Sequence, residues 1–185
     1  MDSKIERQDT LYRLQQAIVW LRRIGHCRGF GIQSPSDYRF VRYVVNEHWP
    51  YYAYAGLGKC DSWLKRKKGR LFFRLANDLQ PDSIADLLGY EEYLKAGCCK
   101  AALSSQVTPS SSPRLLLVPA SADMQAVCKA CDEQTALVVD DIGRHTRAWK
   151  EVLANEKVTV TFDLYYCGIA FFDPQRTPKH YKVNF

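Results

Sequence analysis

From Pro81 onward, short apolar runs alternate with segments of helical pattern, and this alternation restricts the possible folds more than any other feature. The runs "RLLLVPAS" (114–121) and "TALVVDD" (135–141) have the length of buried strands. Between and after them, "SADMQAVCKACDE" (121–133), with Ser121 as its expected N-cap, and "RHTRAWKEVLANE" (144–156) have the pattern of helices. Because strands joined by helices run parallel, we expect an α/β fold with a mainly parallel sheet flanked by helices.

A possible nucleotide cradle precedes these elements. Residues 82–97, "DSIADLLGYEEYLKAG", predict a buried strand, a turn and the start of a helix. A cradle of this kind usually needs several glycines, so that the backbone can approach the ligand closely. Gly89 is the only glycine at the turn. The segment is therefore either an intact cradle or a reduced one.

The end of the chain changes its pattern. The segments "VTVTFDLYYCGIAFFD" (158–173) and "KHYKVNF" (179–185) have no helical segment between them, so we expect strands in an antiparallel arrangement at the sheet edge. The polar stretch "SSQVTPSSSPR" (104–114) is rich in serine and proline and predicts a loop.

The first part of the chain is predicted to be helical. Leu11, Leu14, Ile18 and Leu21 recur at spacings of three and four, which places them on one face of a helix. We expect residues 1–80 to form a helical cap and residues 81–185 to form the sheet-containing core, the two packed as a single domain.

Two more helices are expected in this cap. Ser34 is a good N-cap, Pro35 suits the first helical position, and the apolar stripe that follows predicts a helix to about Val45. A further helix is expected over residues 61–79, interrupted or bent at Gly69.

Positive charge is concentrated at the front of the chain. Residues 1–75 carry a net charge of +9 and residues 76–185 a net charge of −3, with the densest basic run at "KRKKGR" (65–70). Such a run is usually a solvated helix face. Because it has no interleaved aromatic residues and no known nucleic-acid motif, binding to nucleic acid is not expected.

The length of 185 residues suits one domain. No apolar run approaches the roughly 20 residues that span a bilayer, and the N-terminal residues carry charges of both signs without a signal-type apolar core. We therefore expect a cytoplasmic protein without membrane insertion, whose seven cysteines are reduced thiols.

Two segments resemble a known family. The tail "VVDDIGRHTRAWKEVLANEKVTVTFDLYYCGIAFF" (138–172) has a strand ending in Asp-Asp-Ile, a helix with Ala-Trp and a strand pair. The front stretch "GFGIQSPSDYRFV" (29–41) is followed by "YYAY" (51–54). They resemble the C-terminal part and the N-terminal cap of bacterial class I S-adenosylmethionine-dependent O-methyltransferase-like proteins. The resemblance implies a Rossmann-like methyltransferase sheet with antiparallel C-terminal edge strands and an N-terminal helical cap.

The middle of the chain departs from that family. Active members have a glycine-rich turn after the first strand, where this chain has Asp86 and Gly89 as remnants of a cofactor-binding site. Tyr90, Glu91 and Glu92 add bulk and negative charge where the cofactor's carboxylate would lie. The next strand, "LLLVPAS", lacks the acidic residue of active relatives.

One pair of adjacent acidic residues lies where a metal-binding or catalytic site could form. Asp140 and Asp141 end a strand, where open α/β sheets place their ligand crevice. The resemblance implies that, in an active enzyme, these two acids would hold a divalent metal and serve catalysis. The alternative is that one caps the following helix and the other is solvated or ion-paired. Asp163 could be a third acid if the sheet twist brings it close.

Two other groups of residues have alternative interpretations. Cys128 and Cys131 have the spacing of a zinc or redox pair, or one packs inward while the other lies at the rim. The aromatic residues Trp49, Tyr51, Tyr52 and Tyr54 either line a small-molecule cleft or pack the cap on the sheet.

Two functions follow as expectations. The first is a methyltransferase-like pseudoenzyme that has lost S-adenosylmethionine binding and catalysis and persists as a binding or structural module. The second is an active S-adenosylmethionine-dependent O-methyltransferase that methylates a small-molecule acceptor. In this enzyme Asp140 and Asp141 would hold a divalent metal ion that assists the reaction. The sequence identifies no physiological partner.

Overall fold

The computed structural model describes residue 14 and residues 17–26, 29–106 and 112–185. Its helical elements are η1 (Ile24–His26), α2 (Pro35–Phe40), the π-helical segment η2 (Val41–Val45), η3 (Tyr52–Ala55), α3 (Trp63–Leu79), α4 (Glu91–Gly97), α5 (Met124–Ala130) and α6 (Thr146–Leu153). Its strands are β1 (Ser83–Asp86), β2 (Ala102–Ser104), β3 (Leu115–Pro119), β4 (Ala136–Asp140), β5 (Val160–Asp163), β6 (Cys167–Phe171) and β7 (Lys179–Lys182).

The strands form a single seven-stranded sheet in the order β2-β1-β3-β4-β6-β5-β7. All neighbouring pairs are parallel except those that β6 makes with β4 and with β5. The expected α/β fold with a mainly parallel sheet is therefore confirmed. The expectation of antiparallel strands in the C-terminal segment is confirmed for β6, which is antiparallel to both β4 and β5. It is wrong for the edge itself, because the edge strand β7 runs parallel to β5.

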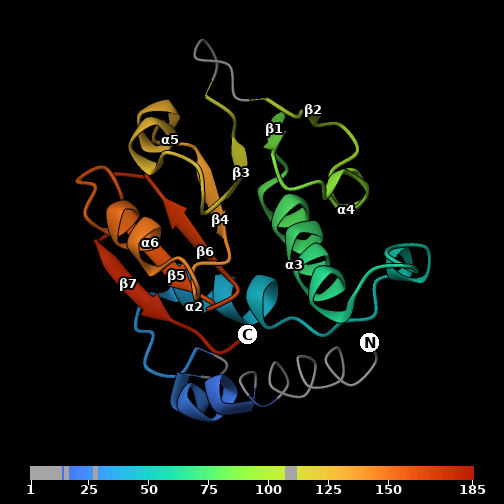
Figure 1. Ribbon diagram of the computed structural model, residues 1–185, viewed down its shortest axis with the longest axis horizontal. Coiled ribbons are helices and arrows are strands. Elements are labelled where there is room, and N and C mark those ends of the chain that lie inside the picture. Colours follow the sequence, from blue (N-terminus) through green and yellow to red (C-terminus); the bar gives the residue numbers. More distant parts are fainter. Residues whose placement is uncertain (1–13, 15–16, 27–28, 107–111) are drawn as a thin grey trace, which may run out of the picture.

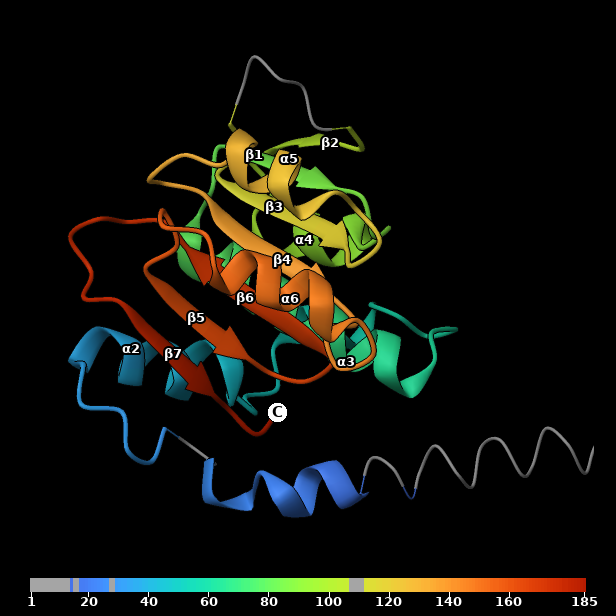
Figure 2. The ribbon, with the colours of Figure 1, turned by 60° about the vertical axis from the view of Figure 1, so that its left-hand side comes forward.

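Helices cover both faces of the sheet. Figure 2 shows α5 and α6 in front of the strands and α3 and α4 behind them. Two separate hydrophobic clusters correspond to these two layers, one containing Phe72 and Leu94 and the other Met124 and Trp149. Because both faces are covered, β3 and β4 are continuous apolar runs rather than alternating ones.

The helical front of the chain shares its core with the sheet. The ring of Phe40, at the end of α2, lies 4.8 Å from that of Phe162 in β5 and 5.3 Å from that of Phe171 in β6. In Figure 1, α3 runs alongside the sheet as the longest labelled helix. Residues before and after position 80 thus contribute to one hydrophobic cluster.

Two predictions from local sequence in the cap can be compared with the structure, and one is confirmed while the other is wrong. Ser34 caps α2, because its Oγ accepts a hydrogen bond from the Asp37 amide, with Pro35 in the first turn. Gly69 does not interrupt α3, which is continuous over Trp63–Leu79. Its missing side chain instead makes room for Tyr93, since a Cβ atom at this position would lie 2.5 Å from the tyrosine ring.

Other expectations about helices need correction. Leu14, Ile18 and Leu21 are exposed, so this apolar stripe is not packed against the sheet, and Leu11 lies outside the described residues. The N-cap of α5 is Asp123 rather than Ser121, because the Asp123 carboxylate accepts from the amides of Gln125 and Ala126. Within the described ranges, no helix has the length and apolar character needed to cross a bilayer.

Candidate functional site

The point where the chain reverses its direction of travel across the sheet lies between β1 and β3. From β1 the chain goes to β2 on one side, and it then returns to β3 on the other side. In open α/β sheets the ligand crevice lies outside the carboxyl ends of the strands at such a point. The residues that follow β1 and β3 therefore define the candidate cofactor corner, which comprises Asp86 to Tyr90 and Pro119 to Ser121.

Asp86 turns its carboxylate onto the backbone of its own loop. One oxygen accepts hydrogen bonds from the amides of Leu88, at 2.9 Å, and Gly89, at 3.1 Å. The other accepts from the amide of Tyr90. Asp86 is buried, and Gly89 adopts a positive φ of 76° that lets the loop fold back around it. The amides that could contact a ligand here are thus bound to a protein carboxylate.

Tyr90 fills the space beside this loop. It is only 5% exposed, and its ring lies 4.7 Å from that of Phe72 in an edge-to-face arrangement. The ammonium group of Lys68 lies 5.9 Å from the centre of the same ring. Burial, reinforced by the nearby Asp140 carboxylate, raises the pKa of the Tyr90 phenol, which therefore stays neutral.

The two glutamates that follow Tyr90 lie outside this corner. Glu91 and Glu92 are both exposed, and Glu91 forms an ion pair with Lys95 one turn along α4. The expectation that they bring negative charge into the corner is therefore wrong. It is the bulk of Tyr90 that occupies the corner.

The adjacent acids Asp140 and Asp141 point in different directions. Both oxygens of Asp140 lie 2.7 Å from the Nζ atom of Lys68 in α3. Asp141 adopts a left-handed conformation with φ of 53° and is half-buried, and its carboxylate lies 4.0 Å from the guanidinium of Arg144 and 3.9 Å from the ring of His145. Neither side chain caps α6. The structure thus matches the alternative in which these acids are ion-paired or solvated, without the helix cap.

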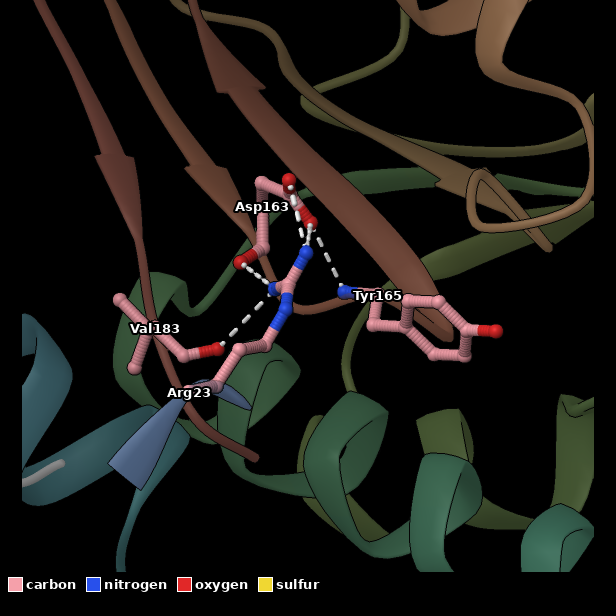
Figure 3. A network of polar contacts seen from close by, with 4 residues as sticks. All are labelled: Arg23, Asp163, Tyr165 and Val183. Atoms are coloured by element: carbon pink, nitrogen blue, oxygen red, sulfur yellow. Dashed lines mark hydrogen bonds and ion pairs between the residues drawn. The ribbon is translucent and has the colours of Figure 1, made fainter. Parts of the chain in front are cut away.

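Asp163 is engaged by an arginine from the front of the chain. Its two carboxylate oxygens accept from the guanidinium of Arg23 at 2.9 and 3.0 Å, and one of them also accepts from the amide of Tyr165. Figure 3 shows the guanidinium between this carboxylate and the carbonyl of Val183. This network holds the residues before η1 against the ends of β5 and β7.

These acids do not fit a divalent metal. The described part of the chain contains no group of three or more histidine, cysteine or acidic residues that could hold an ion. Asp140 and Asp163 are each already neutralised by a buried or half-buried cation. We therefore derive no metal-dependent step.

The cysteines do not form a metal or redox site in the described residues. Cys128 and Cys131 are both buried, so the expectation that one lies at the rim is wrong. Burial raises the pKa of the Cys131 thiol to about 12, which disfavours the thiolate that metal binding and redox exchange need. Cys98 is buried while Cys99 is exposed, and Cys27 lies outside the described residues.

The basic run in α3 is not a simple solvated face. Lys68 and Arg74 are buried, and Lys67 is largely desolvated between the rings of Trp63, Tyr166 and Phe185. The sequence-based interpretation missed these residues. Their helical spacing, which places positions 67, 70 and 74 on one face with aromatic residues nearby in the sequence, could have indicated a basic cleft.

Donors and space at the corner do not fit S-adenosylmethionine. The loop amides are bound by Asp86, Tyr90 fills the adjacent volume, and β3 ends at Pro119 and is followed by Ala120 and Ser121, none of which has a carboxylate. Comparisons of this chain with protein-family models, with curated proteins and with solved structures found no match.

Proposed function

We propose that this protein is a methyltransferase-like pseudoenzyme: a Rossmann-like domain that no longer binds S-adenosylmethionine and acts as a binding module. The sheet supports this proposal by its topology, with parallel strands at the front, a reversal point at β1 and β3, and one antiparallel strand near the C-terminal side. The two segments that resemble the methyltransferase-like family form α2, β4, α6, β5 and β6, and of these β4 lies directly beside β3.

The loss of cofactor binding rests on one observation, the three hydrogen bonds that the Asp86 carboxylate accepts from residues 88–90. A ligand that needed these amides would have to displace the carboxylate and leave it buried without partners. Removing partners from a buried charged group costs several kcal/mol, roughly 3–5 in measured cases. This cost would weaken a micromolar dissociation constant to roughly the millimolar range.

A metal-assisted O-methyltransferase is the second candidate, and the site supports it less. It would need Asp140 free to bind an ion, whereas Lys68 contacts both of its oxygens. No observation of the described residues favours this candidate over the first.

Isothermal titration of the purified protein with S-adenosylmethionine and with S-adenosylhomocysteine tests the proposal. We expect no saturable binding of either compound at concentrations up to about 1 mM. A dissociation constant in the micromolar range would contradict it. Transfer of labelled methyl groups to phenolic or carboxylic acceptors would support the second candidate instead.

A further inference from the structure

A cleft of about 740 Å³ opens between residues 45–55, α3 and the C-terminal Phe185. It is distinct from the cofactor corner, because neither Asp86 nor Tyr90 lines it. Its size lies within the range of roughly 300–1,000 Å³ that is typical of small-molecule sites. We call it the cationic cleft, after the basic side chains of α3 that form one wall.

The basic wall consists of Arg66, Lys67, Arg70 and Arg74. No carboxylate of the described residues lies within ion-pair distance of any of the four, and Glu47 is the only acid among the described lining residues. The Glu47 carboxylate accepts a hydrogen bond from the Trp49 amide. The wall is therefore a concentration of positive charge whose four members form no ion pair with a described residue.

This arrangement carries a cost for the protein on its own. Arg66, Arg70 and Arg74 follow one another at spacings of four along α3, and like charges at this spacing destabilise a helix by about 0.2–0.5 kcal/mol per pair. A bound anion would convert this repulsion into attraction. The charge pattern therefore favours an anionic ligand.

Two residues that line the cleft each have a buried polar atom without a hydrogen-bond partner. Arg70 Nε and Asn46 Nδ2 are buried and have no hydrogen-bond partner among the described residues. Buried donors of this kind are rare, because each forfeits its hydration without compensation. Arg66 and Arg74, in contrast, already donate to protein oxygens and contribute mainly their positive field. Arg70 is thus the side chain best placed to donate directly to an anion.

Exposed aromatic side chains also line the cleft, Trp63 from α3 itself and Trp49 and Tyr52 from residues 45–55. Trp49 is 70% exposed, Tyr52 is fully exposed and Trp63 is 57% exposed, and all three line the cleft. Tyr51 and Tyr54 play a different part, because they pack against Phe73 beneath the surface. Exposed flat rings beside cations are the two elements that recognise an aromatic group bearing a phosphate.

We propose that the cationic cleft binds a small ligand that joins an aromatic ring system to a phosphate group, as a nucleoside monophosphate does. The terminal guanidinium nitrogens of Arg70 donate to the phosphate oxygens, and the exposed rings stack on the base. This assignment rests on the proposed binding role and names the site and the ligand class through which it acts.

Calorimetric titration with AMP at low salt tests the assignment, with adenosine and inorganic phosphate as partial ligands. We expect AMP to bind with a dissociation constant below about 100 μM, and each partial ligand to bind at least tenfold more weakly. Absence of AMP binding would overturn the proposal, and so would phosphate binding as tight as AMP binding. A short single-stranded oligonucleotide that bound tenfold more tightly than AMP would overturn it in favour of nucleic acid.

Three variants place the binding in the cleft. Arg70→Gln removes the positive charge and its donor geometry and should weaken AMP binding about tenfold or more. Tyr52→Ala removes a fully exposed ring, so folding is unaffected, and should weaken binding at least about fivefold. Lys129→Gln removes an equivalent charge from α5, on the other face of the sheet, and should bind like the unmodified protein. Unchanged binding in both cleft variants would overturn the proposal.

The result is separable from the test of the cofactor corner. S-adenosylmethionine binding that persists in Arg70→Gln would contradict the lost cofactor site and leave the cationic cleft unaffected. Absence of AMP binding, together with absence of S-adenosylmethionine binding, would overturn only the cleft assignment.

Discussion

Lys68 Nζ lies 2.7 Å from both carboxylate oxygens of Asp140, so α3 is tied directly to the carboxyl end of β4. Lys68 is buried, and its side chain retains 10% of its exposure while that of Asp140 retains 19%. The pair lies beside Tyr90 and neutralises the acid that a methyltransferase-like site would use. A residue that sequence analysis assigned to chemistry is here part of a structural ion pair.

Breaking this pair should reduce stability. We expect Lys68→Met to lower the free energy of unfolding by about 3 kcal/mol, because it leaves Asp140 charged and poorly hydrated. The double variant Lys68→Met/Asp140→Leu should recover most of this loss, since neither charge remains. Urea denaturation measures both effects.

The matched control is Arg147→Ala, which removes the exposed partner of Glu151 and should change stability by less than about 0.5 kcal/mol. If Lys68→Met were no more costly than this control, the structural role of the pair would be refuted.

Asp86 should contribute to stability more than an ordinary capping residue does. Asp86→Ala leaves three loop amides without an acceptor in a buried setting, and we expect a loss of about 2–4 kcal/mol. Asp123→Ala, at the exposed N-cap of α5, removes two similar hydrogen bonds and should cost only about 1 kcal/mol. Thermal or urea unfolding compares the two, and equal losses would argue against a buried, fully engaged Asp86.

Lys67 should make the free energy of unfolding depend on pH in the alkaline range. Burial lowers its pKa from 10.5 to about 8 in the folded protein, although three aromatic rings surround the ammonium. Between pH 8 and 10.5 the unfolded chain therefore binds more protons at Lys67 than the folded protein does. Over this range the contribution of Lys67 to the free energy of unfolding rises with pH, by at most about 3 kcal/mol.

Lys67→Met removes the cost of the buried charge. We expect this variant to be about 1–3 kcal/mol more stable than the unmodified protein at pH 7, with the difference shrinking as the pH approaches 10. Denaturation curves at several pH values measure this difference. A difference that did not change with pH would show that Lys67 does not titrate in this range.

Arg23 should control the attachment of the front of the chain. It donates to both carboxylate oxygens and the backbone carbonyl of Asp163 (Figure 3). The amide of Asn184, the residue after Val183, donates to the carbonyl of His26. Loss of hydrogen bonds to a charged group costs about 1.5–3 kcal/mol each. In Arg23→Ala we expect the Asn184 amide to exchange at least about tenfold faster, while amides of the central strand β4 stay protected. Hydrogen exchange followed by NMR measures both, and unchanged exchange at Asn184 would contradict the anchoring role.

Local sequence signals were sufficient for much of the fold. The apolar runs that became β3 and β4, and the Ser34-Pro35 start of α2, carry their structural information in a few adjacent residues. The insertion of β6 between β4 and β5 could not be read in this way. A strand's neighbours depend on the packing of the whole sheet, and the residues of β6 are compatible with an edge or an interior position.

The site was less predictable than the fold for a similar reason. The single glycine after β1 made this turn the predicted cofactor-binding segment, but the sequence did not reveal that Tyr90 is buried while Glu91 and Glu92 face solvent. The partner of Asp140 lies 72 positions earlier, in a basic run that was interpreted as a solvated face. Side-chain direction and long-range pairing decide this site, and neither leaves a local pattern.

The central claim is that the loop amides after β1 are already occupied by the protein itself. The most direct measurement follows the backbone amide NMR signals of Leu88, Gly89 and Tyr90 during titration with S-adenosylmethionine. Our account predicts that these three signals stay at their original positions up to about 1 mM ligand. Saturable movement of the same signals at micromolar concentrations would contradict it.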